Sequence, residues 1–261
     1  MRLARYIQAK FKFPSEPSLL IAEQSSPGDC FRKVTAVHSE AGRKREVQLY
    51  LSPNLRFLSR EILDTTLDPR AEEEREEKEL QAGLSPASAA TKGPMNAPVT
   101  LTVFSDFQCY YCAKLANMLK SEVLPYEGDK LRLVYRHLPL TSHVWARAAA
   151  EAAACAGEQS DEAFWELHDL IFANQRDLTK DNLGTSISRF AGQVGKLDRP
   201  RFDACVATRQ TSPAVEQDVA FAKKHGLTGT PTLFMNGRRV ENVSEAVQLR
   251  TLIRQSESLR R

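Results

Sequence analysis

The stretch Val99-Thr-Leu-Thr-Val-Phe-Ser-Asp-Phe-Gln-Cys-Tyr-Tyr-Cys112 decides the fold of this chain. Its first half is an apolar, β-branched run that is typical of a buried strand. Its second half ends in a Cys-x-x-Cys motif, and residues 113–123 after it have the composition of a helix. The pattern therefore predicts a strand that runs directly into a helix whose first turn carries Cys109 and Cys112.

This placement gives the two cysteines different chemistry. At a helix N-terminus the backbone N–H groups are unpaired and the macrodipole is positive, and both lower the pKa of Cys109 and favour its nucleophilic thiolate. Cys112, one turn into the helix, lies behind Cys109 and can resolve a mixed disulfide. The alternative is half of a zinc site, which needs four ligands. We expect no metal here, because the sequence has no second Cys-x-x-Cys.

Composition excludes several classes of protein. The 261 residues carry 36 basic and 33 acidic side chains, and this balance does not indicate nucleic acid or an anionic membrane as a partner. Mean hydropathy is −0.40, and the lack of an apolar run of about 20 residues argues against a transmembrane helix. Residues 1–12 have no apolar core of about 7–15 residues, so we find no signal peptide in this chain.

Changes in composition and hydropathy pattern along the chain predict two domains and a linker. Within residues 1–66, an amphipathic helix precedes alternating strand-like runs, with Ala41-Gly42 as a turn, which indicates a small α+β domain. Residues 67–96 begin with the helix start Asp68-Pro69, continue with a Glu-rich run and end in small, Pro-containing sequence. We expect a linker helix and a flexible linker there, followed by a second domain over 97–261.

The second domain has further signals after the Cys-x-x-Cys motif. Residues 131–135 predict a strand, and an Ala-rich helical region covers about 141–225. Asn236-Gly237 is the strongest short hairpin signal in the chain, and 245–257 read as a final helix. Gly229-Thr-Pro-Thr232 stands just before the hairpin, where an X-Pro bond can be cis or can simply begin an edge strand.

Together these motifs resemble the DsbA-like class of thioredoxin-fold thiol–disulfide oxidoreductases. The resemblance covers 97–258 and rests on five segments in the family's order, namely Phe104-Ser-Asp-Phe-Gln-Cys-Tyr-Tyr-Cys112, Tyr135-Arg-His-Leu-Pro-Leu140, the Ala-rich segment that ends in Cys155, Phe164-Trp-Glu-Leu-His-Asp169 and Gly229-Thr-Pro-Thr232. It implies an α/β thioredoxin fold with a helical subdomain inserted at about 141–225. It also implies that Cys109 attacks and Cys112 resolves.

The same resemblance gives roles to the residues around the motif. Thr230-Pro231 is expected to be cis and to pack against the disulfide, with the Thr230 backbone pairing to an extended substrate segment. Tyr110 and Tyr111 help to set the redox potential, but they differ from the Pro-containing pairs of well-known members. Val103 stands where many relatives carry a buried acid that assists proton transfer from the resolving thiol. The proton acceptor is therefore open.

The first domain resembles the dimerisation domain of the DsbC-type disulfide isomerases. The likeness rests on Pro27-Gly-Asp-Cys-Phe-Arg-Lys-Val34, Gln48-Leu-Tyr-Leu-Ser-Pro-Asn-Leu-Arg-Phe-Leu58 and Glu61-Ile-Leu-Asp-Thr65. That domain is a helix and a small sheet, followed by a linker helix. The resemblance implies a homodimer formed through the N-terminal domain.

The remaining cysteines leave alternatives open. Cys155 and Cys205 both fall in the helical insertion, where they form either a structural disulfide or two buried free thiols. Cys30 is left over, as a free thiol or as an intermolecular bridge. Single histidines such as His137 and His168 are interpreted as structural.

The sequence therefore predicts a thiol:disulfide interchange enzyme that acts on cysteine-containing proteins as oxidase or isomerase, using a redox-active disulfide and no other cofactor. Two alternatives stay open, namely a copper(I)-handling protein that uses the Cys-x-x-Cys as a soft site, and a redox-inert thioredoxin-fold interaction module. The chemistry suits the periplasm or another extracytoplasmic compartment, with a membrane-bound redox partner of unknown identity. A cytoplasmic reductant is the alternative if the natural protein has no signal peptide.

Overall fold

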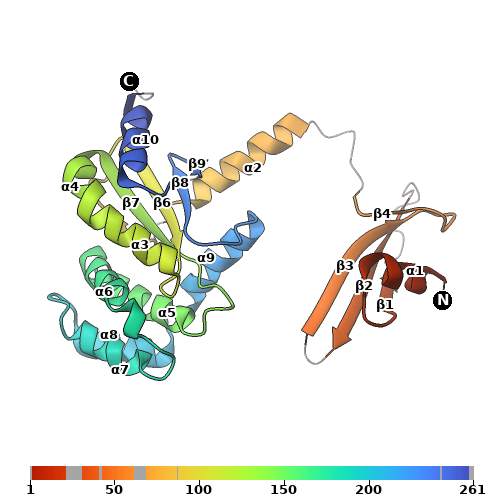
Figure 1. Cartoon of the computed structure of the whole chain (residues 1–261), viewed down its shortest axis with the longest axis horizontal. Coiled ribbons are helices and arrows are strands. Elements are labelled where there is room, and N and C mark those ends of the chain that lie inside the picture. Colours follow the sequence, from red (N-terminus) through yellow and green to blue (C-terminus); the bar gives the residue numbers. More distant parts are fainter. Residues whose placement is uncertain are drawn as a thin grey trace. The chain divides into compact units, whose positions relative to one another are not determined.

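The computed structural model describes residues 2–21, 31–40, 43–61, 69–86, 88–241 and 243–258. Within it the chain divides into two compact units, Met1–Glu72 and Glu73–Arg261 (Figure 1). The predicted Ala41-Gly42 turn, the Asp68 helix start and Cys30 lie outside the described residues. That each unit folds as an independent domain stays a prediction.

The first unit is the small α+β element expected from its sequence. Helix α1 (Arg2–Phe11) precedes a four-stranded antiparallel sheet, with strands in the order β1 (Ser18–Ile21), β2 (Arg32–Glu40), β3 (Arg43–Leu51) and β4 (Leu58–Ser59). Alternation along β2 and β3 directs every second side chain to one face of the sheet. On that face Ala36 and Leu49 pack with Ile7 of α1 and with Phe13 to form the core.

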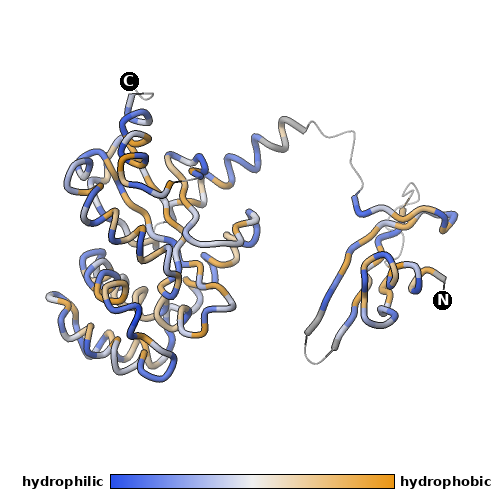
Figure 2. The backbone as a smooth tube through the Cα atoms, viewed as in Figure 1, coloured by the Kyte–Doolittle hydropathy of each residue, from blue (hydrophilic) through white to orange (hydrophobic). Residues whose placement is uncertain are grey.

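The second unit is built on a five-stranded mixed sheet in the order β5-β7-β6-β8-β9. Its strands are β5 (Thr91–Lys92), β6 (Val99–Ser105), β7 (Leu131–His137), β8 (Thr232–Met235) and β9 (Arg238–Val240). Strands β6 and β7 are parallel, whereas β8 runs antiparallel to β6. Figure 2 shows that these central strands are largely hydrophobic, as expected for a sheet that is covered on both faces.

Helices cover both faces of this sheet. Helix α3 (Tyr110–Met118) continues through a π-helical turn (Leu119–Val123) into α4 (Leu124–Glu127) and a 3₁₀ turn (Gly128–Lys130). Because side chains alternate along β6, Leu101 and Val103 pack against α3 and α10 (Ala246–Ser258), while Phe104 faces α9 (Ser212–Lys224). This arrangement, seen in Figure 1, is the predicted thioredoxin fold.

The helical insertion lies between β7 and β8, as predicted. It consists of α5 (Ala146–Gly157), α6 (Asp161–Ala173), a 3₁₀ turn (Gln175–Asp177), α7 (Leu183–Ala191), α8 (Arg199–Thr208) and α9. The alanines of α5 allow neighbouring helices to approach closely, and Ala149 and Ala153 are fully buried against Phe164. The insertion therefore has a large core of its own, which continues to Phe107 beside the Cys-x-x-Cys motif.

The segment expected to be a flexible linker differs from that prediction. Helix α2 (Pro69–Gly83) is mostly hydrophilic, as Figure 2 shows, but the residues after it pack on the second unit. Leu84 is buried in a cluster with Phe104, and Thr91–Lys92 pair with β7. The physical reason is that β7 would otherwise be an open edge, and a short strand satisfies its backbone groups.

A buried arginine fixes the end of α2. Arg136 of β7 donates to the carbonyl oxygen of Gly83 and, from Nε, to Asp218 Oδ1 at 2.6 Å. Its guanidinium lies over the rings of Phe104 and Phe221, 5.0 and 4.6 Å from their centroids. The charge is thus paired and stacked inside the protein rather than solvated.

Candidate functional site

Cys109 and Cys112 lie at the beginning of α3, directly after β6. Cys109 is the N-cap residue with an extended backbone, and its carbonyl oxygen accepts from the Cys112 N–H at 3.1 Å. Local sequence explains this placement, because the apolar strand β6 ends at Ser105 and helix α3 begins at Tyr110, inside the motif. The Cys109 side chain therefore sits at the unpaired N–H groups of the helix.

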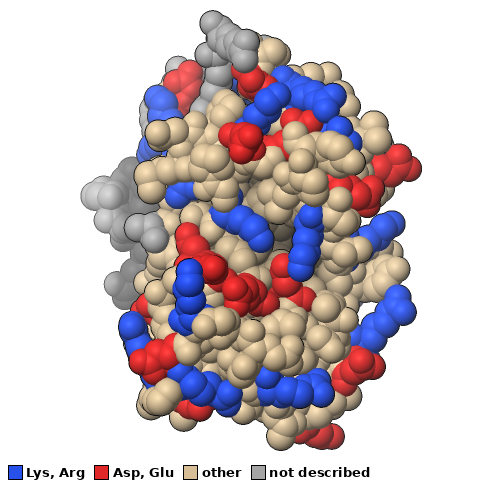
Figure 3. All heavy atoms as spheres, turned by 90° about the vertical axis from the view of Figure 1, so that its left-hand side faces the viewer, with Lys and Arg blue, Asp and Glu red and all other residues tan. Residues whose placement is uncertain are grey.

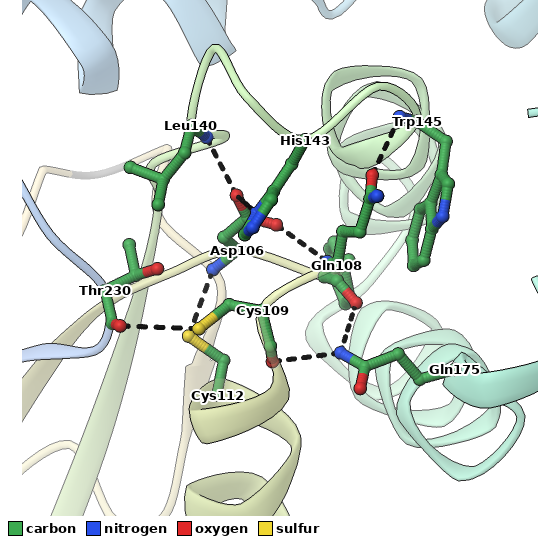
Figure 4. A network of polar contacts seen from close by, with 10 residues as sticks. Asp106, Gln108, Cys109, Cys112, Leu140, His143, Trp145, Gln175 and Thr230 are labelled. Atoms are coloured by element: carbon green, nitrogen blue, oxygen red, sulfur yellow. Dashed lines mark hydrogen bonds and ion pairs between the residues drawn. The ribbon is translucent and has the colours of Figure 1, made fainter.

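The two thiols are adjacent (Figure 4), but their pKa values are shifted in opposite directions. Both are free in this structure, with Cys109 7% and Cys112 1% exposed. A hydrogen bond from Cys112 is the largest of the contacts that lower the pKa of Cys109 to about 5 against the effect of burial. Burial in turn raises the pKa of Cys112 far above the ordinary thiol range. Cys109 is thus a thiolate at neutral pH, and Cys112 keeps its proton.

The loop before β8 closes over the cysteines. The Thr230-Pro231 peptide bond is cis, and the Cys109 thiol lies 3.3 Å from the carbonyl oxygen of Thr230. Thr232 holds the turn, since its hydroxyl donates to the Gly229 carbonyl oxygen at 2.7 Å. The structure thus brings Thr230 and Pro231 to the thiol pair, 121 residues away in sequence from Cys109.

A groove begins beside the motif. It has a volume of about 620 Å³, and its lining includes Tyr111, Thr230, Pro231, Arg239 and Glu241. Tyr111 itself is 68% exposed, and Tyr110, whose ring packs edge to face on that of Tyr111 with centroids 5.5 Å apart, is 59% exposed. A pair of exposed aromatic rings therefore lies next to the reactive Cys109 and offers apolar contact area to a second molecule.

Asp106 organises the loop in front of the thiols, a role that sequence reasoning missed. Its buried carboxylate accepts from the backbone N–H groups of Gln108 at 2.6 Å and Leu140 at 2.8 Å, and it pairs with His143 at 2.7 Å. The Asp106 N–H donates to Cys112 Sγ at 3.4 Å (Figure 4). The available signal was an Asp directly after a strand end, where its side chain can bond two residues ahead.

Two glutamines connect the motif to the helical insertion, and neither was singled out in the sequence. Gln175 Nε2 donates to the carbonyl oxygens of Phe107 and Cys109 at 2.8 and 2.9 Å. Gln108 Oε1 accepts from the backbone N–H of Trp145 at 2.9 Å. The insertion therefore holds the backbone of the active-site loop directly, as Figure 4 shows.

Cys155 and Cys205 lie apart from this site. Cys155 of α5 and Cys205 of α8 form a disulfide, with Cα atoms 5.9 Å apart, so the structure takes the first of the two alternatives left by the sequence. Within the described ranges no group of three or more His, Cys, Asp or Glu side chains is arranged to hold a metal ion. Figure 3 shows one face of the molecule on which Lys and Arg alternate with Asp and Glu, without a region of one sign.

Comparison with solved structures gives the same fold. The chain is similar to alpha-DsbA1 of Wolbachia pipientis, with a TM-score of 0.60, 19% identity and coverage of 69% of this chain and 96% of that one. It is also similar to BdbD of Bacillus subtilis, with a TM-score of 0.57, 19% identity and coverage of 66% and 94%. The second unit therefore has the DsbA-like form of the thioredoxin fold.

Curated sequences give a different set of relatives. The chain is similar to Na(+)/H(+) antiporter NhaA 3 of Salinispora tropica, with 39% identity over 176 residues that cover 65% of this chain and 26% of that protein. NhaA 1 of Salinispora arenicola matches over the same length at 37% identity. The chain thus spans about a quarter of the length of the curated relatives it matches. Among the described residues, none of the helices is both long and apolar enough to span a bilayer.

A family model described as Thioredoxin matches residues 87–255, more than half of the chain. The matched region contains the Cys-x-x-Cys motif, the loop with the cis proline and the whole helical insertion. With the sheet order and the solved structures, this match leaves one assignment: the chain belongs to the thioredoxin family.

Proposed function

We propose that this protein catalyses thiol–disulfide exchange on cysteine-containing proteins through Cys109 and Cys112. The observation that carries the proposal is the contrast between the two thiols, because Cys109 is a stabilised thiolate and Cys112 a buried, protonated neighbour. A nucleophilic thiolate is required to attack a disulfide, and a second thiol in contact is required to release the mixed disulfide.

In the oxidising direction, a substrate thiolate attacks the Cys109 sulfur of the Cys109–Cys112 disulfide. A mixed disulfide forms and Cys112 leaves with the electron pair. A second thiolate of the substrate then attacks the substrate sulfur that is bonded to Cys109. The substrate gains a disulfide, and both enzyme cysteines are left reduced. In the isomerising direction, reduced Cys109 attacks a wrong substrate disulfide and is expelled after the substrate rearranges, with no net change in electrons.

Substrate binding is assigned to the groove beside the Thr230 loop. An extended polypeptide segment in this groove would place its cysteine next to Cys109 and its backbone against Thr230, as a form of strand addition. The exposed, mutually packed rings of Tyr110 and Tyr111 would add apolar contacts beside the sulfur, and the lining residues Arg239 and Glu241 supply both signs of charge. The site is therefore suited to unfolded segments of varied sequence rather than to one small ligand.

We propose that the protein performs this exchange as an oxidase or as an isomerase, in an extracytoplasmic compartment. We assign the N-terminal unit to homodimerisation, because its edge strand β1 exposes Leu20 at 65% and Ile21 at 50%. Two catalytic units in one dimer would favour isomerisation, whereas the DsbA-like catalytic unit favours oxidation. Reoxidation of Cys109 and Cys112 needs a redox partner, and we place that partner in the membrane.

A paired assay tests the proposal. The protein is added to a reduced, unfolded substrate with several cysteines and, separately, to the same substrate with scrambled disulfides. Activity in at least one assay is expected, with loss in Cys109→Ser. Cys112→Ser should instead accumulate a mixed disulfide with the substrate, visible on a non-reducing gel. A folded protein that is inactive in both assays would contradict the proposed function.

A further inference from the structure

A small cavity, separate from the substrate groove, lies beside the resolving thiol. It has a volume of about 30 Å³, enough for one or two water molecules. Cys112 lines it together with apolar residues that include Val103. Its polar lining consists of Ser105, Tyr135, His168, Asp169, Lys92 and Lys120. Polar side chains thus extend from the buried sulfur to Lys120, whose side chain is 61% exposed.

The inner end of the cavity favours a polar occupant. Tyr135 is 3% exposed, and its hydroxyl makes no hydrogen bond of ordinary length and angle among the described residues, with the Ser105 side chain as a weak hydrogen-bonding neighbour. A buried hydroxyl with no partner at all costs about 1–3 kcal/mol, and a water molecule in the cavity would complete the hydrogen bonding that Ser105 supplies only weakly. The buried Ser105 hydroxyl lies beside both Cys112 and Tyr135. Water there would therefore contact the thiol region.

The outer end carries a histidine–carboxylate pair. His168 Nδ1 lies 2.9 Å from Asp169 Oδ1, and Asp169 Oδ2 lies 2.7 Å from Lys120 Nζ. A carboxylate at Nδ1 fixes the tautomer that donates there, which leaves Nε2 as a free base. Burial is the main cause that lowers the pKa of His168. The imidazole is thus neutral at pH 7 and able to accept a proton.

The charged groups around His168 act on its pKa in opposite directions. The titratable groups that face it are Asp169 on the same helix, Lys92 on β5, Lys120 after α3, and Tyr135 and His137 on β7. Asp169 favours the imidazolium, and the two lysines oppose it. Burial, the largest single effect, raises the pKa of Asp169, but the hydrogen bonds from His168 and Lys120 and their charges together outweigh it and lower the pKa to about 2. The carboxylate is therefore charged throughout the working range.

We propose that His168 accepts the proton of Cys112 through water in this cavity, in place of the carboxyl group that position 103 does not supply. The inference rests on the proposed function. When Cys112 resolves a mixed disulfide, its S–H proton passes to His168 Nε2 as its sulfur bonds to Cys109. The Cys109–substrate bond breaks, the substrate sulfur leaves with the electron pair, and His168 later releases the proton to solvent beside Lys120.

The resolving step can be observed directly with the full-length chain in a Cys30→Ser background. Reduced protein is mixed with one equivalent of 5,5′-dithiobis(2-nitrobenzoic acid). Attack by Cys109 releases one thionitrobenzoate in a first phase, and displacement by Cys112 releases the second. His168→Gln should slow the second phase about 10²-fold at pH 7 and leave the first unchanged. Tyr135→Phe, which keeps the ring, should slow the second phase by a smaller factor.

The pH profile separates a proton acceptor from a structural residue. In the parent protein the second phase should be constant between about pH 7 and pH 9, because the base is already neutral. In His168→Gln it should rise about tenfold per pH unit, since hydroxide then removes the proton. His225→Gln is the matched control, because this histidine packs on Phe221 and does not line the cavity.

The outcomes are distinct for the two proposals. A His168→Gln protein with the parent's second-phase rate and flat profile would overturn the proton-transfer inference and leave the proposed function intact. If that variant fails to fold, an unchanged second phase in Tyr135→Phe overturns the inference instead. A parent protein that shows no fast first phase would count against the proposed function itself.

Discussion

Asp106 Oδ2 lies 2.7 Å from His143 Nδ1, and the same carboxylate oxygen accepts from the Leu140 N–H at 2.8 Å. One buried side chain therefore connects the end of β6, where the cysteine motif begins, to the loop after β7. Carboxylates that accept several hydrogen bonds have no neutral substitute, because an amide presents a donor at one of its two ends.

The Asp106→Asn variant should lose about 1–3 kcal/mol of unfolding free energy, since its NH₂ group must face one of the N–H donors that the carboxylate now accepts. Urea denaturation of the reduced protein measures the loss. Asp129→Asn, at an exposed position of the same unit, should change the midpoint little. Equal stabilities of the two variants would show that the Asp106 contacts do not support the loop.

The Cys109 thiolate predicts a specific pH dependence of alkylation. Because the pKa of Cys109 is about 5, its rate of reaction with iodoacetamide should be half-maximal near that pH and flat above about pH 7. Mass spectrometry after short pulses identifies the modified residue, and Cys112 should stay unmodified while the protein is folded. A rate that still rises between pH 7 and pH 9 would contradict a stabilised thiolate.

The same thiolate predicts how the stability of the reduced protein changes with pH. The folded-state pKa lies below the ordinary thiol value of 9.0, so the stabilisation is present above that value and is lost as pH falls towards about 5. The difference in unfolding free energy between reduced parent and Cys109→Ser should therefore grow from pH 5 to pH 8. A constant difference over this range would show that the charge does not stabilise the fold.

The disulfide of the insertion should support stability but not catalysis. It joins residues 50 positions apart, and a loop of that length gives about 4 kcal/mol in the chain-entropy treatment. The Cys155→Ala/Cys205→Ala variant should lose a comparable amount in urea denaturation and keep the Cys109 alkylation rate at temperatures where it is folded. Loss of thiolate reactivity in the folded variant would mean that the two cysteine pairs are coupled.

Arg136 predicts a large effect from a change outside the active site. Arg136→Met leaves Asp218 buried without its guanidinium partner and Gly83 without a donor, which should cost about 3–5 kcal/mol. Asp218→Asn in the same chain should recover part of this loss, because it removes the unpaired charge. If Arg136→Met alone costs under about 1 kcal/mol, the buried pair contributes little to holding the end of α2.

Exposed apolar residues on β1 test the proposed dimer. Leu20→Lys places a charge on an edge strand, a change that disfavours pairing with another chain. We expect the parent protein to sediment as a dimer and Leu20→Lys as a monomer with an unchanged far-ultraviolet spectrum. Val247→Lys, at an exposed position of α10, is the matched control. Thr35→Lys would not serve, because Thr35 pairs with both neighbouring strands. A monomeric parent would contradict the dimer.

The parts of this molecule that sequence predicted are those encoded within a few residues. An apolar run followed at once by Cys109 and Cys112 predicts a strand that leads into a helix with the cysteines in its first turn. Asn236-Gly237 likewise predicts the turn of the terminal hairpin. The short strand β5 could not be found in this way. Two residues carry no periodicity, and their pairing depends on an open strand edge formed by β7, since Thr91 pairs with Val134 and Lys92 with Leu133.

The supporting residues of the site escaped prediction for a related reason. Asp106 is recognisable only with Leu140 and His143, which lie 34 and 37 residues away. Gln175 is 66 residues from Cys109. A lone polar residue in a sequence is ambiguous, and only the fold shows which backbone groups it reaches.

The burial of the second cysteine pair has a consequence for a protein whose proposed work is to exchange disulfides. Cys155 and Cys205 are 1% and 5% exposed, so no thiolate can approach either sulfur along the S–S axis while the insertion is folded. In the proposed role the protein would mix repeatedly with reactive thiols, its own Cys109 included. The fold of the insertion thus protects the Cys155–Cys205 disulfide kinetically from the exchange reactions that are proposed for Cys109 and Cys112.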